Sequence, residues 1–226
     1  RPISGLSQIT IAVPSLQSLT LITSNDEYQL AYVINVPSLK YLYLQGFAED
    51  DSCLIENTPE LVEANITDVC GLISEKIHGS LTSVKRLSSE IASPLDLVML
   101  IFPFEFLVAI TLCNLQPKIH AYALYWWNLF MLMLDSSPNL QVLKLIGVSI
   151  IYKERFGKGD RVAYKRWSQP KYVYECLLNR LKTLVWEDYE GEVEDEREVA
   201  QYILRNARRL ETATFSKTDI QPLLGL

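Results

Sequence analysis

The sequence predicts an α/β fold of stacked repeats, in which short strands from successive repeats form one curved parallel sheet. Two observations predict it. The phrase at residues 14–21 occurs again at residues 37–44, a shift of 23 positions. Within each copy apolar residues alternate with polar ones, which is the pattern of a strand that buries one face.

The repeated phrase has the form Pro-x-Leu-x-x-Φ-x-Φ, where Φ is an apolar residue. Copies begin at Pro14, Pro37, Pro59 and Pro138. Each proline suits a chain that is turning into a strand, because proline has a fixed φ and no N–H to donate to the middle of a sheet.

Degenerate copies continue the register between these phrases. They are Val84-x-x-Leu87 and Leu107-x-x-Ile110-x-Leu112, and wider spacings before Leu140, Leu181 and Leu210 indicate insertions in the later repeats. A period of about 20–29 residues that carries Leu-x-x-Leu-x-Leu is typical of a leucine-rich repeat. We therefore expect a leucine-rich-repeat (LRR) solenoid.

In such a fold the Φ residues build the core, and the residues between them face the concave side, where repeat proteins commonly bind partners. Ten of these outward residues are our candidates for protein binding: Thr20, Tyr41, Tyr43, Glu63, Asn65, Arg86, Lys144, Thr183, Thr212 and Thr214. Further outward positions are Ser18, Ser88, Thr111, Val142 and Val185. Tyr41 and Tyr43 stand out, because neighbouring outward aromatics are typical of an interface anchor, although a solvated tyrosine pair is the alternative.

Composition excludes some classes of function. The net charge is −6 and the pI is near 5.1, which argues against a nucleic-acid-binding surface. We find no Gly-x-Ser-x-Gly, Walker or His-Glu-x-x-His motif, so the sequence predicts no enzyme and no catalytic residue. The most apolar stretch, residues 95–113, contains Pro103 and Glu105 and is interpreted as buried core rather than a membrane span.

The four cysteines, Cys53, Cys70, Cys113 and Cys176, stand singly. They form no Cys-x-x-Cys pair with nearby histidines, so we predict neither a metal site nor any other cofactor site. Reduced thiols packed in the core are the favoured interpretation, and they indicate a cytoplasmic or nuclear location.

Three segments between the repeats carry their own signals. Residues 119–134 are rich in aromatics and predict an apolar helix that ends near residues 135–138. Residues 153–171 hold seven Lys or Arg against two acids and are interpreted as an exposed loop. Asp195 and Glu198 have the spacing of a capping box, which predicts a helix over residues 196–209 after an acidic loop.

The C-terminal part resembles a known module. Its residues run as a strand ending in Trp186, a Tyr189-Glu190-Gly191 loop, a helix ending in Asn206-Ala207 and a closing strand over residues 210–215. This order is similar to the FBD module of plant F-box/LRR/FBD proteins, and the upstream repeats look like those of the same family. Two residues depart from the family pattern: Tyr174 stands where proline is usual, and Ser89 where leucine is usual.

The resemblance implies a division into repeats (1–150), a basic linker loop (151–172) and an FBD-like module (173–226). It also implies a non-catalytic interaction module that recognises the protein substrate of a Skp-cullin-F-box (SCF) ubiquitin ligase. Skp and cullin would be reached only through an F-box, which we do not find in this chain. The alternative is a stand-alone LRR/FBD binding protein without a ligase role.

Overall fold

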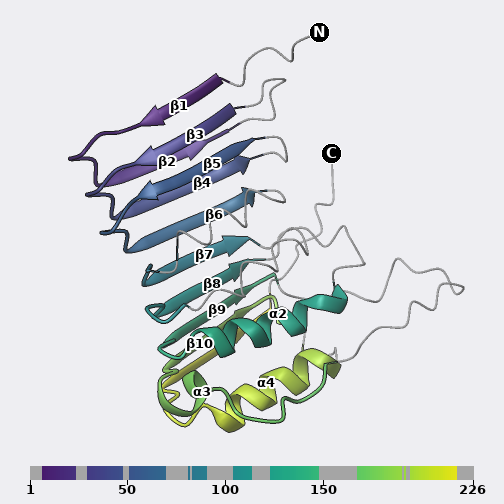
Figure 1. The fold of residues 1–226 in the computed structure, drawn as a ribbon. Helices are drawn as coiled ribbons and strands as arrows, with labels where there is room; N and C mark the ends of the chain where they lie inside the picture. Colours follow the sequence, from purple (N-terminus) through teal and green to yellow (C-terminus); the bar gives the residue numbers. More distant parts are fainter. Residues whose placement is uncertain are drawn as a thin grey trace, which may run out of the picture.

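The computed structural model describes residues 7–23, 30–47, 51–69, 81, 83–90, 104–113, 123–147, 167–189, 191 and 194–217. These residues form a mixed α/β fold with two parallel sheets and helices toward the C-terminal end (Figure 1). The small sheet has the strand order β1-β3-β5, and the large sheet has the order β11-β10-β9-β8-β7-β6-β4-β2. Each sheet keeps its strands in chain order, and β1 to β6 alternate between the two sheets.

The large sheet takes one strand from each repeat. Its members are β2 (Ser18–Ile22), β4 (Tyr41–Phe47), β6 (Glu63–Val69), β7 (Arg86–Glu90), β8 (Ala109–Cys113), β9 (Val142–Ile146), β10 (Thr183–Glu187) and β11 (Thr212–Ser216). Equivalent residues of the repeats are register partners; for example, Leu42 pairs with Leu19 on one side and with Ala64 on the other. The predicted strand positions are therefore confirmed.

The prolines occupy a β-turn before the strands. In each of the four clear copies, the carbonyl of the residue before proline accepts a hydrogen bond from the N–H of the second residue after proline. In the second copy, for example, Leu39 N–H donates to Val36 O at 3.1 Å. Pro14, Pro37, Pro59 and Pro138 are thus at the second position of their turns, where the fixed φ of proline is favourable.

A ladder of backbone hydrogen bonds joins these turns from repeat to repeat. The Gln17 carbonyl accepts from the N–H groups of both Lys40 and Tyr41, at 2.9 and 3.1 Å. The carbonyls of Lys40, Val62, Lys85, Val108, Gln141 and Lys182 each accept two N–H groups from the next repeat in the same way. The stack is therefore held in register by the backbone before the strands begin.

The small sheet was not predicted from the sequence. It consists of β1 (Ser7–Ile11), β3 (Leu30–Asn35) and β5 (Ser52–Asn57), which lie in the return segments of the first repeats. Ile34 and Ile55 are buried, and the ring of Tyr32 packs edge-on against Phe47 of the large sheet with centroids 5.6 Å apart. The two sheets thus share one core.

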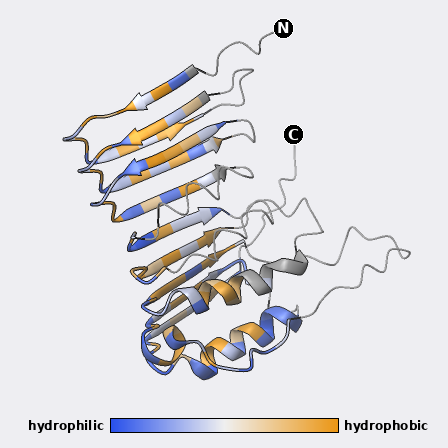
Figure 2. Ribbon diagram, in the orientation of Figure 1, coloured by the Kyte–Doolittle hydropathy of each residue, from blue (hydrophilic) through white to orange (hydrophobic). Residues whose placement is uncertain are grey.

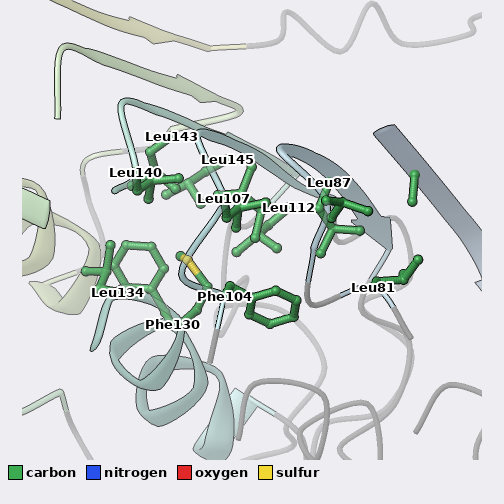
Figure 3. Close-up of a cluster of buried hydrophobic side chains, with 14 of the residues drawn as sticks. Leu81, Leu87, Phe104, Leu107, Leu112, Phe130, Leu134, Leu140, Leu143 and Leu145 are labelled. Carbon is green, nitrogen blue, oxygen red and sulfur yellow. The ribbon is translucent and has the colours of Figure 1, made fainter. Parts of the chain in front are cut away.

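Helices accompany the later repeats. They are α2 (Ala123–Ser136), α3 (Glu175–Asn179) and α4 (Glu194–Asn206). Phe130 and Leu134 of α2 belong to the same buried cluster as Leu140, Leu143 and Leu145 (Figure 3). The hydropathy colouring shows apolar residues on α2 and a more polar α4 (Figure 2).

The helices differ from their predicted limits. The predicted helix at residues 119–134 corresponds to α2, whose predicted start lies outside the described residues. The α4 helix begins at Glu194, so Asp195 lies inside its first turn and the predicted capping box is wrong. Glu194, Asp195 and Glu196 instead place negative charge at the positive end of the helix dipole.

The end of α4 was also placed too far along the chain. Arg208 and Arg209 lie beyond the helix because Leu210 N–H donates to Ala207 O at 3.2 Å, in the same turn that precedes the other strands. Of the predicted basic loop at 153–171, residues 153–166 lie outside the described residues. Within the described residues, no helix is long and apolar enough to cross a membrane.

Cys53 and Cys176 are buried free thiols, and Cys113 is a half-buried one. Cys70 lies outside the described residues. Burial raises the pKa of the Cys53 thiol to about 12, and burial likewise raises that of Cys176 to about 12. The Cys176 Sγ also lies 3.3 Å from the Leu134 carbonyl oxygen, to which it donates.

These thiols predict a loss of stability at alkaline pH. Because their folded pKa lies above the unfolded value, the unfolded chain releases protons first as the pH rises from about 9 toward 12. The free energy of unfolding should fall there by about 1.4 kcal/mol per pH unit for each thiol. Urea unfolding at pH 8, 9 and 10 measures this, and a Cys53→Ala/Cys176→Ala double variant should show a shallower fall; an equal slope would contradict the assignment.

Ser89 is the departure from leucine that the sequence shows, and it is an inward residue of β7. It is 2% exposed, its register partners are Ile66 and Leu112, and its hydroxyl has no hydrogen-bond partner among the described residues. A buried hydroxyl without a partner destabilises a fold.

Replacing Ser89 with alanine should therefore stabilise the protein. We expect Ser89→Ala to raise the free energy of unfolding by about 1 kcal/mol, because an orphaned polar group is removed from the core. Urea unfolding checks this. The control is Ser88→Ala on the outward side of the same strand, which should change stability by less than about 0.5 kcal/mol; a destabilised Ser89→Ala protein would refute the expectation.

Candidate functional site

The outward side of the large sheet is the candidate site. Because register partners in neighbouring strands point to the same side, the outward residues line up in rows across the sheet. One row contains Tyr41, Glu63, Arg86, Thr183 and Thr212, together with Ser18, Ala109 and Val142. The next row contains Thr20, Tyr43, Asn65, Lys144 and Thr214, together with Ser88, Thr111 and Val185.

All ten predicted candidates thus lie on one side of one sheet. The structure places them there but does not by itself assign them a partner.

A third row of outward residues was not predicted from the sequence. It exists because the strands continue one residue beyond the last Φ position. It includes Ile22, Gln45, Thr67, Glu90, Cys113, Ile146, Glu187 and Ser216. The even spacing of outward positions would have revealed it.

The two tyrosines differ in their surroundings. Tyr43 donates through its hydroxyl to Gln45 Oε1 at 2.8 Å and accepts from Thr67 Oγ1 at 3.4 Å. Tyr41 has no such anchor among the described residues and is 47% exposed. Tyr43 is therefore held in place, whereas Tyr41 presents an aromatic face to solvent.

The outward residues Arg86 and Lys144 each form an ion pair with a carboxylate of the same face. Arg86 Nε lies 2.8 Å from Glu63 Oε2 on the neighbouring strand, and Lys144 Nζ lies 2.7 Å from Glu187 Oε1. These pairs are partly solvated, so each contributes little to stability, of the order of 0–1 kcal/mol. Their main effect is electrostatic, because each pair cancels a positive and a negative charge on the outward face.

Cys113 lies close to the second of these pairs. Partial burial raises the pKa of its thiol, Glu90 and Glu187 raise it further, and Lys144 lowers it. The thiol is therefore protonated at neutral pH and is not an activated nucleophile. Among the described residues no cluster of His, Cys, Asp and Glu could hold a metal ion.

Two strands of the C-terminal unit extend the same face. Trp186 at the inward side of β10 is fully buried, and its ring lies 5.1 Å from that of Tyr189 and 6.3 Å from that of Phe215 in β11. The Tyr189 N–H donates to the Ser216 carbonyl at 3.0 Å. Tyr189, two residues beyond the end of β10, is thereby bonded to the last residue of β11.

The position of the Tyr189 ring explains why residue 191 is a glycine. Its φ is +67°, and a Cβ at this residue would lie 3.0 Å from Tyr189 Cε1. A side chain here would meet both backbone strain and a crowded ring. This accounts for a glycine two residues after the tyrosine.

The other departure from the family pattern, Tyr174, is compatible with this backbone. Tyr174 has φ −64° and ψ 143°, which are values that proline adopts. Its side chain is buried, and the ring packs edge-on against Tyr172 with centroids 5.4 Å apart. Tyrosine therefore keeps the chain direction of a proline and adds buried aromatic contact.

Comparison with known proteins agrees with this C-terminal geometry. Residues 169–215 match the protein family described as FBD. An Arabidopsis thaliana F-box/FBD/LRR-repeat protein is 48% identical over 221 residues, covering 96% of this chain and 48% of that protein. Over nearly its whole length the chain is similar to F-box/FBD/LRR-repeat proteins.

Further relatives show the same similarity. A putative F-box/FBD/LRR-repeat protein of Arabidopsis thaliana is 44% identical, covering 96% of this chain and 44% of that protein. An FBD-associated F-box protein of the same plant is also 44% identical, covering 93% of this chain and 44% of that protein. The chain thus spans a little less than half the length of these relatives. No solved structure matches it.

Gly46 and Gly191 give a test of the backbone geometry. Gly191→Ala should lower the free energy of unfolding by about 1–2 kcal/mol, the cost of a left-handed backbone for a residue with a Cβ. Gly46→Ala should cost more, because Gly46 has φ +78° and its Cβ would collide with the backbone carbonyl of Thr23 rather than with a movable side chain.

Chemical unfolding of both variants measures the difference. Gly191→Asn serves as a control, since asparagine tolerates the left-handed region better than alanine and should recover part of the loss. Equal losses for Gly46→Ala and Gly191→Ala would contradict the role given to the Thr23 carbonyl.

Proposed function

We propose that this chain is a non-catalytic leucine-rich-repeat solenoid whose outward, concave face binds a protein substrate. The observation that carries the proposal is the alignment of the outward residues in continuous rows over the large sheet, while the apolar residues turn to the other side. An extended face of this kind gives many separate contacts to a large partner.

The chemistry of the face favours a protein partner over a nucleic acid. Its arginine and its lysine, Arg86 and Lys144, are each engaged by a carboxylate of the same face. Phosphate recognition needs cations that are free to neutralise the ligand. Tyr41 next to the Glu63–Arg86 pair instead offers the aromatic and arginine groups that dominate protein interfaces.

The names of the relatives support a role for this face in a ubiquitin ligase. The relatives are named as F-box proteins, and by family resemblance an F-box docks on a Skp adaptor of an SCF complex. In this proposal the repeats (1–150) and the FBD-like module (173–226), joined by the linker 151–172, select the substrate in the cytoplasm or nucleus. In this proposal Skp and cullin are reached through an F-box and not through the outward face.

Affinity purification of the full-length product from plant tissue tests the ligase role. Mass spectrometry should find a Skp adaptor and a cullin together with further enriched proteins, which are the substrate candidates. If the protein is expressed and folded but neither Skp nor cullin co-purifies, the ligase role is wrong and a stand-alone LRR/FBD binding protein takes its place.

The binding face itself is tested by substitution. Tyr41→Ala should weaken binding of a co-purified substrate by about tenfold or more, as truncation of an interface anchor does. The control is Leu204→Ala on α4, which removes a side chain of similar exposure, 44% against 47%, away from the face. Tyr41→Ala should change the free energy of unfolding by less than about 0.5 kcal/mol. Unchanged binding of the substrate by Tyr41→Ala would contradict the assigned face.

A further inference from the structure

The FBD match includes strands that continue the repeat sheet. Residues 169–215 contain β10 and most of β11, and β10 pairs in parallel with β9 of the last repeat, from Thr183↔Val142 to Glu187↔Ile146. Strand β11 then pairs with β10 from Thr183↔Thr212 to Glu187↔Ser216. The outward rows therefore run across the junction between repeats and FBD without a break in register.

Side chains also cross this junction on the outward side. The Lys144–Glu187 ion pair joins β9 of the repeats to β10 of the FBD at 2.7 Å. Just before β10 begins, the Lys182 carbonyl accepts hydrogen bonds from the N–H groups of Glu211 and Thr212, as the equivalent carbonyls do in the repeats. The FBD outward face is thus held in a fixed position relative to the repeats.

The helices of the FBD leave this outward face open. Cys176 and Leu177 of α3 and Val199 and Ile203 of α4 are buried in the same core as Trp186, which is on the inward side of β10. On the outward side Thr212, Thr214 and Ser216 are exposed. The FBD therefore presents a sheet surface to solvent where the repeats present theirs.

We propose that the FBD is part of the recognition surface and that an uncharged, extended segment of the partner protein crosses from the repeats onto it. This inference rests on the proposed function and deepens it. We call Thr183, Val185, Thr212, Thr214 and Ser216 the FBD shelf. These side chains are small, so a partner backbone can approach the sheet more closely here than over Tyr41 or Arg86.

The charge on this part of the face specifies the partner segment. The shelf residues are hydroxyl-bearing or aliphatic, and the neighbouring Lys144 and Glu187 neutralise each other. An acidic or phosphorylated segment would find no unpaired cation on the outward positions of β9, β10 and β11, and a basic one would have to separate the ion pair. Aliphatic and hydroxyl side chains match the shelf without that cost.

Position-specific photocrosslinking tests the proposal. Benzoylphenylalanine is placed, one position at a time, at Tyr41, Thr183, Thr214 and, as a control on an exposed part of α4, Gln201 in the full-length protein. The same partner should be crosslinked from Tyr41, Thr183 and Thr214, and not from Gln201. Crosslinks from Tyr41 alone would overturn the role of the FBD and leave the proposed function standing. Crosslinks from none of the three outward positions would overturn both.

Affinity for that partner gives an independent measurement. Thr214→Glu, on the exposed edge strand, should weaken binding at least tenfold, whereas Gln201→Glu should leave it unchanged. Thr183→Glu should weaken binding as much as Thr214→Glu if the variant folds. If it does not fold, the Thr214→Glu variant alone tests the proposal. Binding should change less than twofold between 50 and 300 mM NaCl, and a steep fall with salt would overturn the uncharged character of the segment.

Discussion

The structure depends on one constraint: no repeat can bury its apolar strand residues without a neighbour. Inward residues in the middle of the stack, such as Leu44 and Leu145, are fully buried, whereas Leu19 and Leu21 at one end are only partly so and Ala213 at the other end is exposed. The carbonyl that accepts two N–H groups from the next repeat holds these neighbours in register. Stability is therefore a property of the stack.

The same register produces the outward face. Once the backbone ladder aligns the strands, residues that are distant along the chain become neighbours across it, as in the Glu63–Arg86 and Lys144–Glu187 pairs. The face is consequently charged in composition but balanced locally. Its aromatic anchor lies toward the first repeats and its small hydroxyl side chains lie toward the last strands, so different parts of one partner would meet different chemistry.

The C-terminal unit shows how the stack accommodates inserted helices. Trp186 contacts Trp127 of α2, Tyr189 and Phe215, with ring centroids between 5.1 and 6.4 Å apart, so a single side chain links the inserted helix to the FBD strands. Helices in the later repeats therefore fill the space that the small sheet fills in the first ones. The sheet itself passes through both regions unchanged.

The sequence by itself determined the strands, the inward residues and the ten outward candidates, because a strand alternates its side chains strictly and the repeated phrase marks where each strand starts. It also located the glycine loop around Tyr189. The third outward row follows from the same alternation and was overlooked. The ion partners and the small sheet could not be derived in this way, since they depend on which repeats lie side by side. The start of α4 was misplaced because Asp195 lies in the first turn of the helix and does not cap it. Its end was misplaced because the β-turn that precedes β11 stops the helix. The repeat spacing predicted that the strands after Leu181 and Leu210 continue the sheet. Only the tertiary structure decided their register against β9, because the hydrogen bonding of Gln141 and Lys182 to their neighbours in space has no signature in the local sequence.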